Sequence, residues 1–175
     1  MKIGIDISQL AHQKTGVANY LKNLVEEMTK LSPEHEYILF FSSLRGTIPP
    51  LKLSKNVTIK QFKIPPTILN ILWNRLHIIP IEWFIGSVDV FMTSDWTEPP
   101  TRKAKKVTII YDTTIYLFPT ETAQKIQAVH KRKNFLVKKE SDMIFTISQS
   151  SKNDINSILD IPKEKISVIY PGLTL

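Results

Sequence analysis

The sequence predicts one α/β domain, built as a doubly wound, mainly parallel sheet with helices on both faces. Short apolar runs rich in β-branched residues alternate along the chain with segments in which apolar residues recur every three or four positions. Strands separated by helices pair in parallel through right-handed crossovers, which places helices on both faces of one sheet. The 175 residues suffice for one such domain with a real core, so we expect residues 1–175 to form a single unit.

The expected strands are apolar runs bounded by Pro, Gly and other turn residues. In chain order they are residues 2–7, 36–41, 57–62, 88–93, 106–111, 142–147 and 166–170.

The expected helices carry their apolar residues on one face. Helix 16–31 ends at Ser32-Pro33, because proline disfavours a helical residue before it. Pro80 divides the apolar segment 67–86 into two short helices, which Trp73 and Trp83 are expected to anchor on the sheet. The remaining helices are residues 122–140 and 151–159.

Composition narrows the function classes. The hydrophobic fraction of 42% excludes disorder, and no apolar run approaches the roughly 18 residues that cross a bilayer. Asp6 stands where a signal peptide needs an apolar residue, and the absence of Cys removes disulfides and thiol nucleophiles, so we expect a cytoplasmic protein. The net charge of +7 favours anionic partners: nucleic acid, anionic membrane or phosphorylated small molecules.

Ligands of open parallel sheets bind outside the carboxyl ends of the strands, which selects residues 8–16, 94–101, 112–120 and 148–151. Gly16 starts a helix, where free N–H groups can bind a phosphate; alternatively Thr15 only caps that helix. His12, in the same loop, is a candidate ligand-facing histidine, whereas His35, His77 and His130 are expected to be surface or packing residues.

Two further strand ends carry polar side chains. Asp112, after Tyr111, could bind hydroxyls or act as a base, or it could cap the following turn. Ser148 and Lys152 could contact phosphate, although a capping box formed by Ser151 and Asp154 would explain that segment structurally. Neither the glycine-rich dinucleotide and P-loop patterns nor a metal-ligand spacing occurs, so we expect no cofactor and no metal.

Helix 122–140 has a basic face with an aromatic residue among the charges. That combination suits an anionic membrane surface, although a charged face is commonly just solvated. The candidate docking residues are Lys131, Arg132, Phe135, Lys138 and Lys139.

Together these segments resemble the amino-terminal half of family-4 glycosyltransferases of the GT-B type. The resemblance rests on five stretches that follow in order: Ile3-Gly4-Ile5-Asp6, Thr15 to Leu24, Val88 to Phe91, Thr108 to Asp112 with Phe118-Pro119, and Ile147 to Gly172.

The resemblance implies a Rossmann-like domain that binds the acceptor, while a carboxyl-terminal domain binds a nucleotide-sugar donor. The implied reaction transfers a sugar to a glycan or lipid-linked acceptor, retains the anomeric configuration and needs no divalent metal. Gly16 would lie near the donor diphosphate, and Tyr111 and Asp112 would act in the cleft, with Tyr111 in place of the family's usual His. The positions of His12, Thr15, Ser148 and Lys152, and not the resemblance, add these four residues to Gly16 as candidate substrate-binding residues.

The donor-binding half has no counterpart in the 175 residues, and Pro171 to Leu175 correspond to the start of its linker. We therefore expect the chain alone to be inactive. The alternative is a non-enzymatic Rossmann-like module for anionic ligands or nucleic acid, but the aromatic–basic interleaving typical of single-strand binding is sparse.

Overall fold

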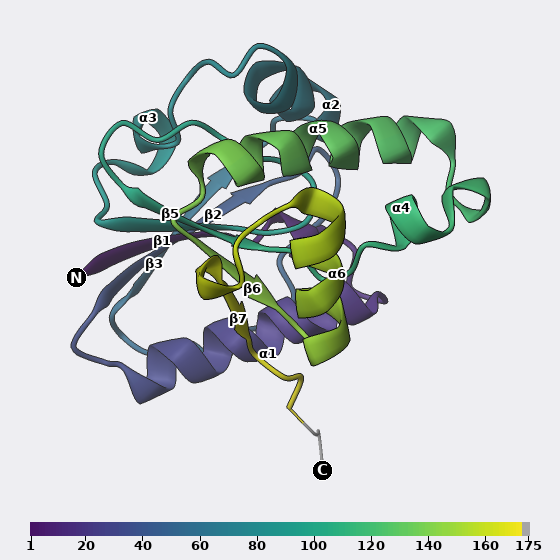
Figure 1. Ribbon diagram of the computed structural model, residues 1–175. Coiled ribbons are helices and arrows are strands. Elements are labelled where there is room, and N and C mark those ends of the chain that lie inside the picture. Colours follow the sequence, from purple (N-terminus) through teal and green to yellow (C-terminus); the bar gives the residue numbers. More distant parts are fainter. Residues whose placement is uncertain (173–175) are drawn as a thin grey trace.

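The computed structural model describes residues 1–172, and Figure 1 shows helices covering both faces of a central sheet. Within that range, parallel strands form one sheet in the order β3-β2-β1-β4-β5-β6-β7. The strands are β1 (Lys2–Asp6), β2 (Glu36–Ser42), β3 (Val57–Phe62), β4 (Val90–Thr93), β5 (Lys105–Ile109), β6 (Met143–Thr146) and β7 (Ile166–Val168). This arrangement is a Rossmann-like, doubly wound α/β fold, which confirms the predicted fold class.

The helices divide unequally between the two faces. Helix α1 (Gly16–Leu31) packs on one face, where Leu21 and Val25 contact the core around Ile5. The other helices cover the opposite face: α2 (Pro66–Leu69) with the π-helix η2 (Asn70–Arg75), α3 (Glu82–Ile85), α5 (Gln124–Glu140) and α6 (Gln149–Leu159). In the sheet, β2 and β3 lie on one side of β1, and β4 to β7 lie on the other. The direction of the crossovers, and with it the face that the helices cover, therefore changes at β1.

Strand β1 lies inside the sheet, between β2 and β4, and leaves no room for a side chain at Gly4. A Cβ there would lie 2.7 Å from the Phe91 ring and 2.8 Å from Ile85 Cδ1. Gly4 therefore makes room on β1 for the ring of Phe91 from β4 and for Ile85 from α3.

Trp73 and Trp83 differ in burial. Trp73 is fully buried, with its ring centroid 5.5 Å from that of Phe40, and its indole N–H donates to Ile79 O. Trp83 is 69% exposed, so the prediction that it anchors its helix on the sheet was wrong. The helix around Trp83 is one turn long and buries Ile81 and Ile85 instead.

The ends of two helices test the capping predictions. Thr15 Oγ1 accepts a hydrogen bond from Ala18 N at 3.2 Å, which confirms Thr15 as the cap of α1. Helix α6 begins at Gln149, and its cap is Ser148, which accepts from Ser151 N at 3.0 Å. The predicted capping box of Ser151 and Asp154 was therefore wrong by one turn, because a serine also stands three residues earlier.

Short helical segments at the loops were not predicted: η1 (Ser8–Ala11), α4 (Thr114–Leu117), η3 (Pro119–Glu121) and η4 (Lys163–Lys165). Each is a single turn, too short for a periodic apolar pattern. No helix within residues 1–172 has both the length and the apolar character to cross a membrane. The sequence predicted that an interdomain linker starts at residues 171–175. Of these, residues 173–175 lie outside the described residues.

Candidate functional site

Three adjoining cavities lie at the carboxyl ends of β1, β4 and β5. The first cavity, of about 330 Å³, is bounded by the segments after β1, β2 and β4. The second, of about 260 Å³, lies between the ends of β4 and β5 and helix α5, and the third, of about 650 Å³, lies between α1, the end of β5 and the segment after β7. Asp95 and Trp96 line both the first and the second cavity, and Val17, Tyr111 and Asp112 line both the second and the third. The cavities therefore follow one another along the edge where ligands of this fold class bind.

The first cavity has a largely apolar lining that includes Ala11, Pro66, Leu69 and one large aromatic, with polar side chains among them. Its polar lining residues are Asp6, Ser8, Gln9, His12, Ser42, Ser43, Ser94, Asp95 and Thr97, and its aromatic is Trp96. Hydroxyl groups can both donate to and accept from the hydroxyls of a polar ligand, and carboxylates can accept from them, while an indole face can cover C–H groups.

Asp6 is the buried acid of the first cavity. Its Oδ1 accepts a hydrogen bond from Ser8 N at 2.8 Å. Burial raises the pKa of the Asp6 carboxyl, and the hydrogen bond from Ser8 and the nearby Lys133 cation oppose that rise.

Tyr111 fixes the wall between the second and third cavities. The residue is buried, its hydroxyl lies 3.0 Å from Ser94 Oγ, and its ring meets the ring of Tyr20 edge-on at 5.6 Å. Burial raises the pKa of the Tyr111 phenol far above its ordinary value, so the hydroxyl stays protonated in neutral solution. Tyr111 can thus position a group by hydrogen bonding but cannot act as a phenolate base.

Asp112 is exposed and lies between the second and third cavities. Its Oδ1 accepts from Thr114 N at 2.8 Å, which is the turn-capping role predicted as one alternative. A carboxylate has further acceptor capacity beyond this bond, so capping and ligand binding are compatible.

Helix α5 supplies the inner wall of the second cavity through His130 and Lys133. The His130 ring lies 4.8 Å from the Trp96 ring, and burial lowers the pKa of His130, so the imidazole is neutral at pH 7. The Lys133 ammonium is buried and donates to Ile109 O at 3.3 Å. Burial lowers the pKa of Lys133, and the carboxylates of Glu98, Asp95 and Asp6 oppose that change.

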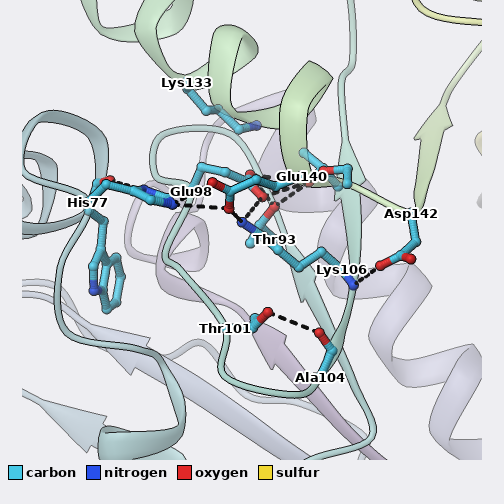
Figure 2. Close-up of polar contacts among 12 residues, drawn as sticks. His77, Thr93, Glu98, Thr101, Ala104, Lys106, Lys133, Glu140 and Asp142 are labelled. Atoms are coloured by element: carbon cyan, nitrogen blue, oxygen red, sulfur yellow. Dashed lines mark hydrogen bonds and ion pairs between the residues drawn. The ribbon is translucent and has the colours of Figure 1, made fainter.

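A buried ion network lies beneath α5, beyond Lys133 (Figure 2). Lys106 Nζ lies 3.1 Å from Glu98 Oε1 and 3.0 Å from Glu140 Oε2. Glu98 also accepts from the hydroxyls of Thr93 at 2.8 Å and Thr108 at 3.1 Å. These bonds attach the loop after β4 and the end of α5 to β5, so the network holds the walls of the second cavity in place.

The structure distributes the predicted site residues among several environments. Gly16, Tyr111 and Asp112 lie together around the third cavity, while His12 lies at the first. Thr15 and Ser148 cap helices, and the Lys152 ammonium donates to the carbonyl of Ile166. The lining residues of the three cavities do not include Thr15, Ser148 or Lys152.

The cations of α5 do not form one free face. Arg132 Nε donates to Asn74 O at 2.8 Å, and Lys138 Nζ lies 2.9 Å from Asp160 Oδ2. Lys131 Nζ lies 5.9 Å from the centre of the Tyr116 ring. Lys139 is exposed, and Phe135 is 67% exposed, as expected for an aromatic among the charges.

The sequence selected the segment 94–101 without singling out Asp95 or Trp96, and it did not identify Asp6 or Lys133 as cavity residues. Asp6 ends β1 and Asp95 is the second residue after β4, and a position at a strand end is a usable signal. Lys133 has a weaker signal, because only its place on the buried face of α5 distinguishes it from the exposed lysines.

The fold and this edge define the chain as a Rossmann-like α/β protein with three adjoining cavities at the carboxyl ends of its strands. No group of three or more His, Cys, Asp or Glu side chains within residues 1–172 is arranged to hold a metal ion. No protein-family model matches the chain, and no curated protein is significantly similar to it.

Proposed function

We propose that the chain is the acceptor-binding half of a retaining, metal-independent glycosyltransferase, which moves a sugar from a nucleotide-sugar to a glycan or lipid-linked acceptor. A donor-binding domain would complete the active site, and the chain alone would be inactive. One observation carries this proposal. The segments with the sequence resemblance, around Gly16, Tyr111–Asp112 and Tyr170–Gly172, are far apart in the chain and line one cavity of about 650 Å³.

The lining of the cavities supports a saccharide acceptor. The first cavity is rich in hydroxyls and has Trp96 at one side, and the second adds Asp112 and Asn134. In this scheme the acceptor lies along the first and second cavities. The donor sugar approaches the third, where Gly16 leaves open space at the start of α1 for a diphosphate.

Asp112 and Tyr111 have different parts in the proposed reaction. Asp112 is exposed, so its side-chain oxygens can accept a hydrogen bond from the acceptor hydroxyl as that hydroxyl attacks the donor sugar. Tyr111, as a neutral phenol bonded to Ser94, positions the sugar by hydrogen bonding.

The pairing of the cations weakens the case for a nucleic-acid module. Several basic side chains are bound to the protein's own carboxylates or carbonyls: Lys2, Lys105, Lys106, Arg132, Lys133, Lys138 and Lys152. Such cations contribute little to a phosphate-tracking surface, which needs free Lys and Arg along one path.

In the cell, the protein would be cytoplasmic and peripheral on the inner face of the membrane.

A nuclear magnetic resonance titration tests the acceptor site. Mono- and oligosaccharides should shift the backbone amides of residues 94–97 and 111–112, and a single-stranded oligonucleotide should not. The opposite result would refute the proposal in favour of the anionic-ligand module: no saccharide shifts, together with oligonucleotide binding that weakens steeply with added salt.

A further inference from the structure

A fourth cavity, which the proposed reaction does not use, lies between η2 and α5. We call it the basic groove. It has a volume of about 480 Å³ and is lined by Asn70, Arg75, Lys125, Ala128, Val129 and Arg132. Three of these described lining residues are cationic and none is acidic, so the groove has a net positive charge. Figure 1 shows the helical segment labelled α2 alongside α5, at the top of the molecule.

A side chain of α5 is bonded to the backbone of η2 at the groove. The Arg132 guanidinium donates through Nε to Asn74 O at 2.8 Å and through Nη2 to Arg75 O at 3.0 Å. These bonds tie α5 to the end of η2 and fix the position of the guanidinium. Because a guanidinium has five N–H donors, Arg132 keeps donors for an anion in the groove. Arg75 and Lys125 are both exposed, on opposite sides of the groove.

Exposed apolar side chains stand next in sequence to two residues of the groove. Ile71 follows Asn70 and Leu76 follows Arg75, and their side chains are 44% and 58% exposed. Ile68, earlier in the same segment, is 45% exposed. The segment from α2 to the end of η2 therefore carries exposed aliphatic side chains as well as a cation of the groove.

We propose that the basic groove and these aliphatic residues dock the protein on an anionic lipid bilayer, with a lipid headgroup phosphate in the groove. A bilayer surface offers phosphates directly above acyl chains, and the α2–η2 segment offers cations directly beside aliphatic side chains. Charge complementarity between the groove and anionic headgroups selects this occupant. The location differs from the basic face expected on helix 122–140, because Arg75 and the aliphatic residues come from the α2–η2 segment.

This inference deepens the proposed function, because Lys125 lies in the first turn of α5, the end that follows β5 and faces the carboxyl edge of the sheet. Docking through the groove would bring the acceptor cavities close to the membrane, where a lipid-linked acceptor is presented.

Vesicle co-sedimentation tests the docking. The protein should bind vesicles that contain phosphatidylglycerol and should not bind vesicles of phosphatidylcholine alone. Arg75→Glu combined with Lys125→Glu should weaken binding at least about tenfold, since each of the two cations near an anionic surface contributes a factor of about five. Lys55→Glu combined with Lys163→Glu makes the same charge change at exposed sites outside the groove and should leave binding nearly unchanged.

A second pair of variants tests the apolar contribution. Ile71→Ser with Leu76→Ser should weaken binding while leaving its dependence on anionic lipid intact. Circular dichroism and urea unfolding verify that each variant folds. Equal binding to neutral vesicles, no binding by the wild-type protein, or equal losses for the groove and control variants would overturn the inference. Because the assay contains no donor or acceptor, its failure is distinguishable from failure of the proposed reaction.

Discussion

Lys106 and Glu98 form a fully buried ion pair, with Lys106 Nζ 3.1 Å from Glu98 Oε1 and side-chain exposures of 3% and 0%. A buried pair of this kind contributes little net stability compared with apolar residues, but losing Glu98 leaves the buried Lys106 with the less deeply buried Glu140 as its remaining carboxylate partner. Its position between β5 and the loop after β4 makes the pair part of the support for the second cavity.

Glu98→Gln should therefore destabilise the protein strongly, by about 3 kcal/mol, because the buried Lys106 and Lys133 both lose a carboxylate. Urea denaturation measures the change. The matched control is Glu36→Gln, which breaks the exposed pair with Lys2 and should cost less than about 1 kcal/mol. Equal effects of the two substitutions would show that the buried network does not support the fold.

Stability should fall as the pH rises above 10. Burial raises the pKa of Tyr111 above its ordinary value of 10.0, so the phenol ionises in the unfolded chain before it ionises in the folded protein. The contribution is fully present below pH 10 and is lost as the pH rises through and beyond that value. Tyr111→Phe should make the stability less sensitive to pH in this range, as measured by thermal unfolding between about pH 8 and 11. An unchanged pH dependence in this variant would mean that Tyr111 is not the responsible group.

Saccharide binding should change the fluorescence of Trp96. Trp96 lines the first two cavities, whereas Trp83 is exposed and belongs to none of the three. Trp96→Phe should remove the response to saccharide, and Trp83→Phe should leave it intact. A response that survives Trp96→Phe would place the saccharide elsewhere.

Asp112→Asn should separate catalysis from stability. The amide oxygen of Asn can still accept from Thr114 N, so the free energy of unfolding should change by less than about 1 kcal/mol. Sugar transfer by the chain joined to a donor-binding domain should fall by about a hundredfold or more, because the amide cannot accept the proton of the attacking hydroxyl. Full activity would rule out Asp112 as the base.

The fold class and most of the elements could be predicted from the sequence, because alternating apolar patterns restrict the chain to a parallel sheet with few allowed connections. The order of the strands in the sheet was not predicted and comes from the structure. The bounds of α1 and β3 agree with the prediction, since Ser32-Pro33 and the flanking prolines mark them sharply. The π-helix η2 was not predicted, because its bonding pattern leaves no distinct apolar period.

The candidate site was only partly predictable. Positions after strands identify Asp112 and the 94–101 segment, because the topology alone brings strand ends together. Lys133 and the Glu98–Lys106 pair were missed, since charged residues are buried only where partners distant in the chain meet them. Trp96 gave no sequence signal for a cavity wall, because its place depends on His130 in α5.

Sugar transfer is the decisive test of the proposed glycosyltransferase function. The chain is joined to the donor-binding domain of a retaining GT-B glycosyltransferase, and nucleotide release from a panel of nucleotide-sugars is measured with saccharide and lipid-linked acceptors. We expect that nucleotide release requires both halves and is lost in the Asp112→Asn variant. If the donor-binding half still binds its nucleotide-sugar while the joined protein neither transfers nor hydrolyses any sugar, the claim is contradicted.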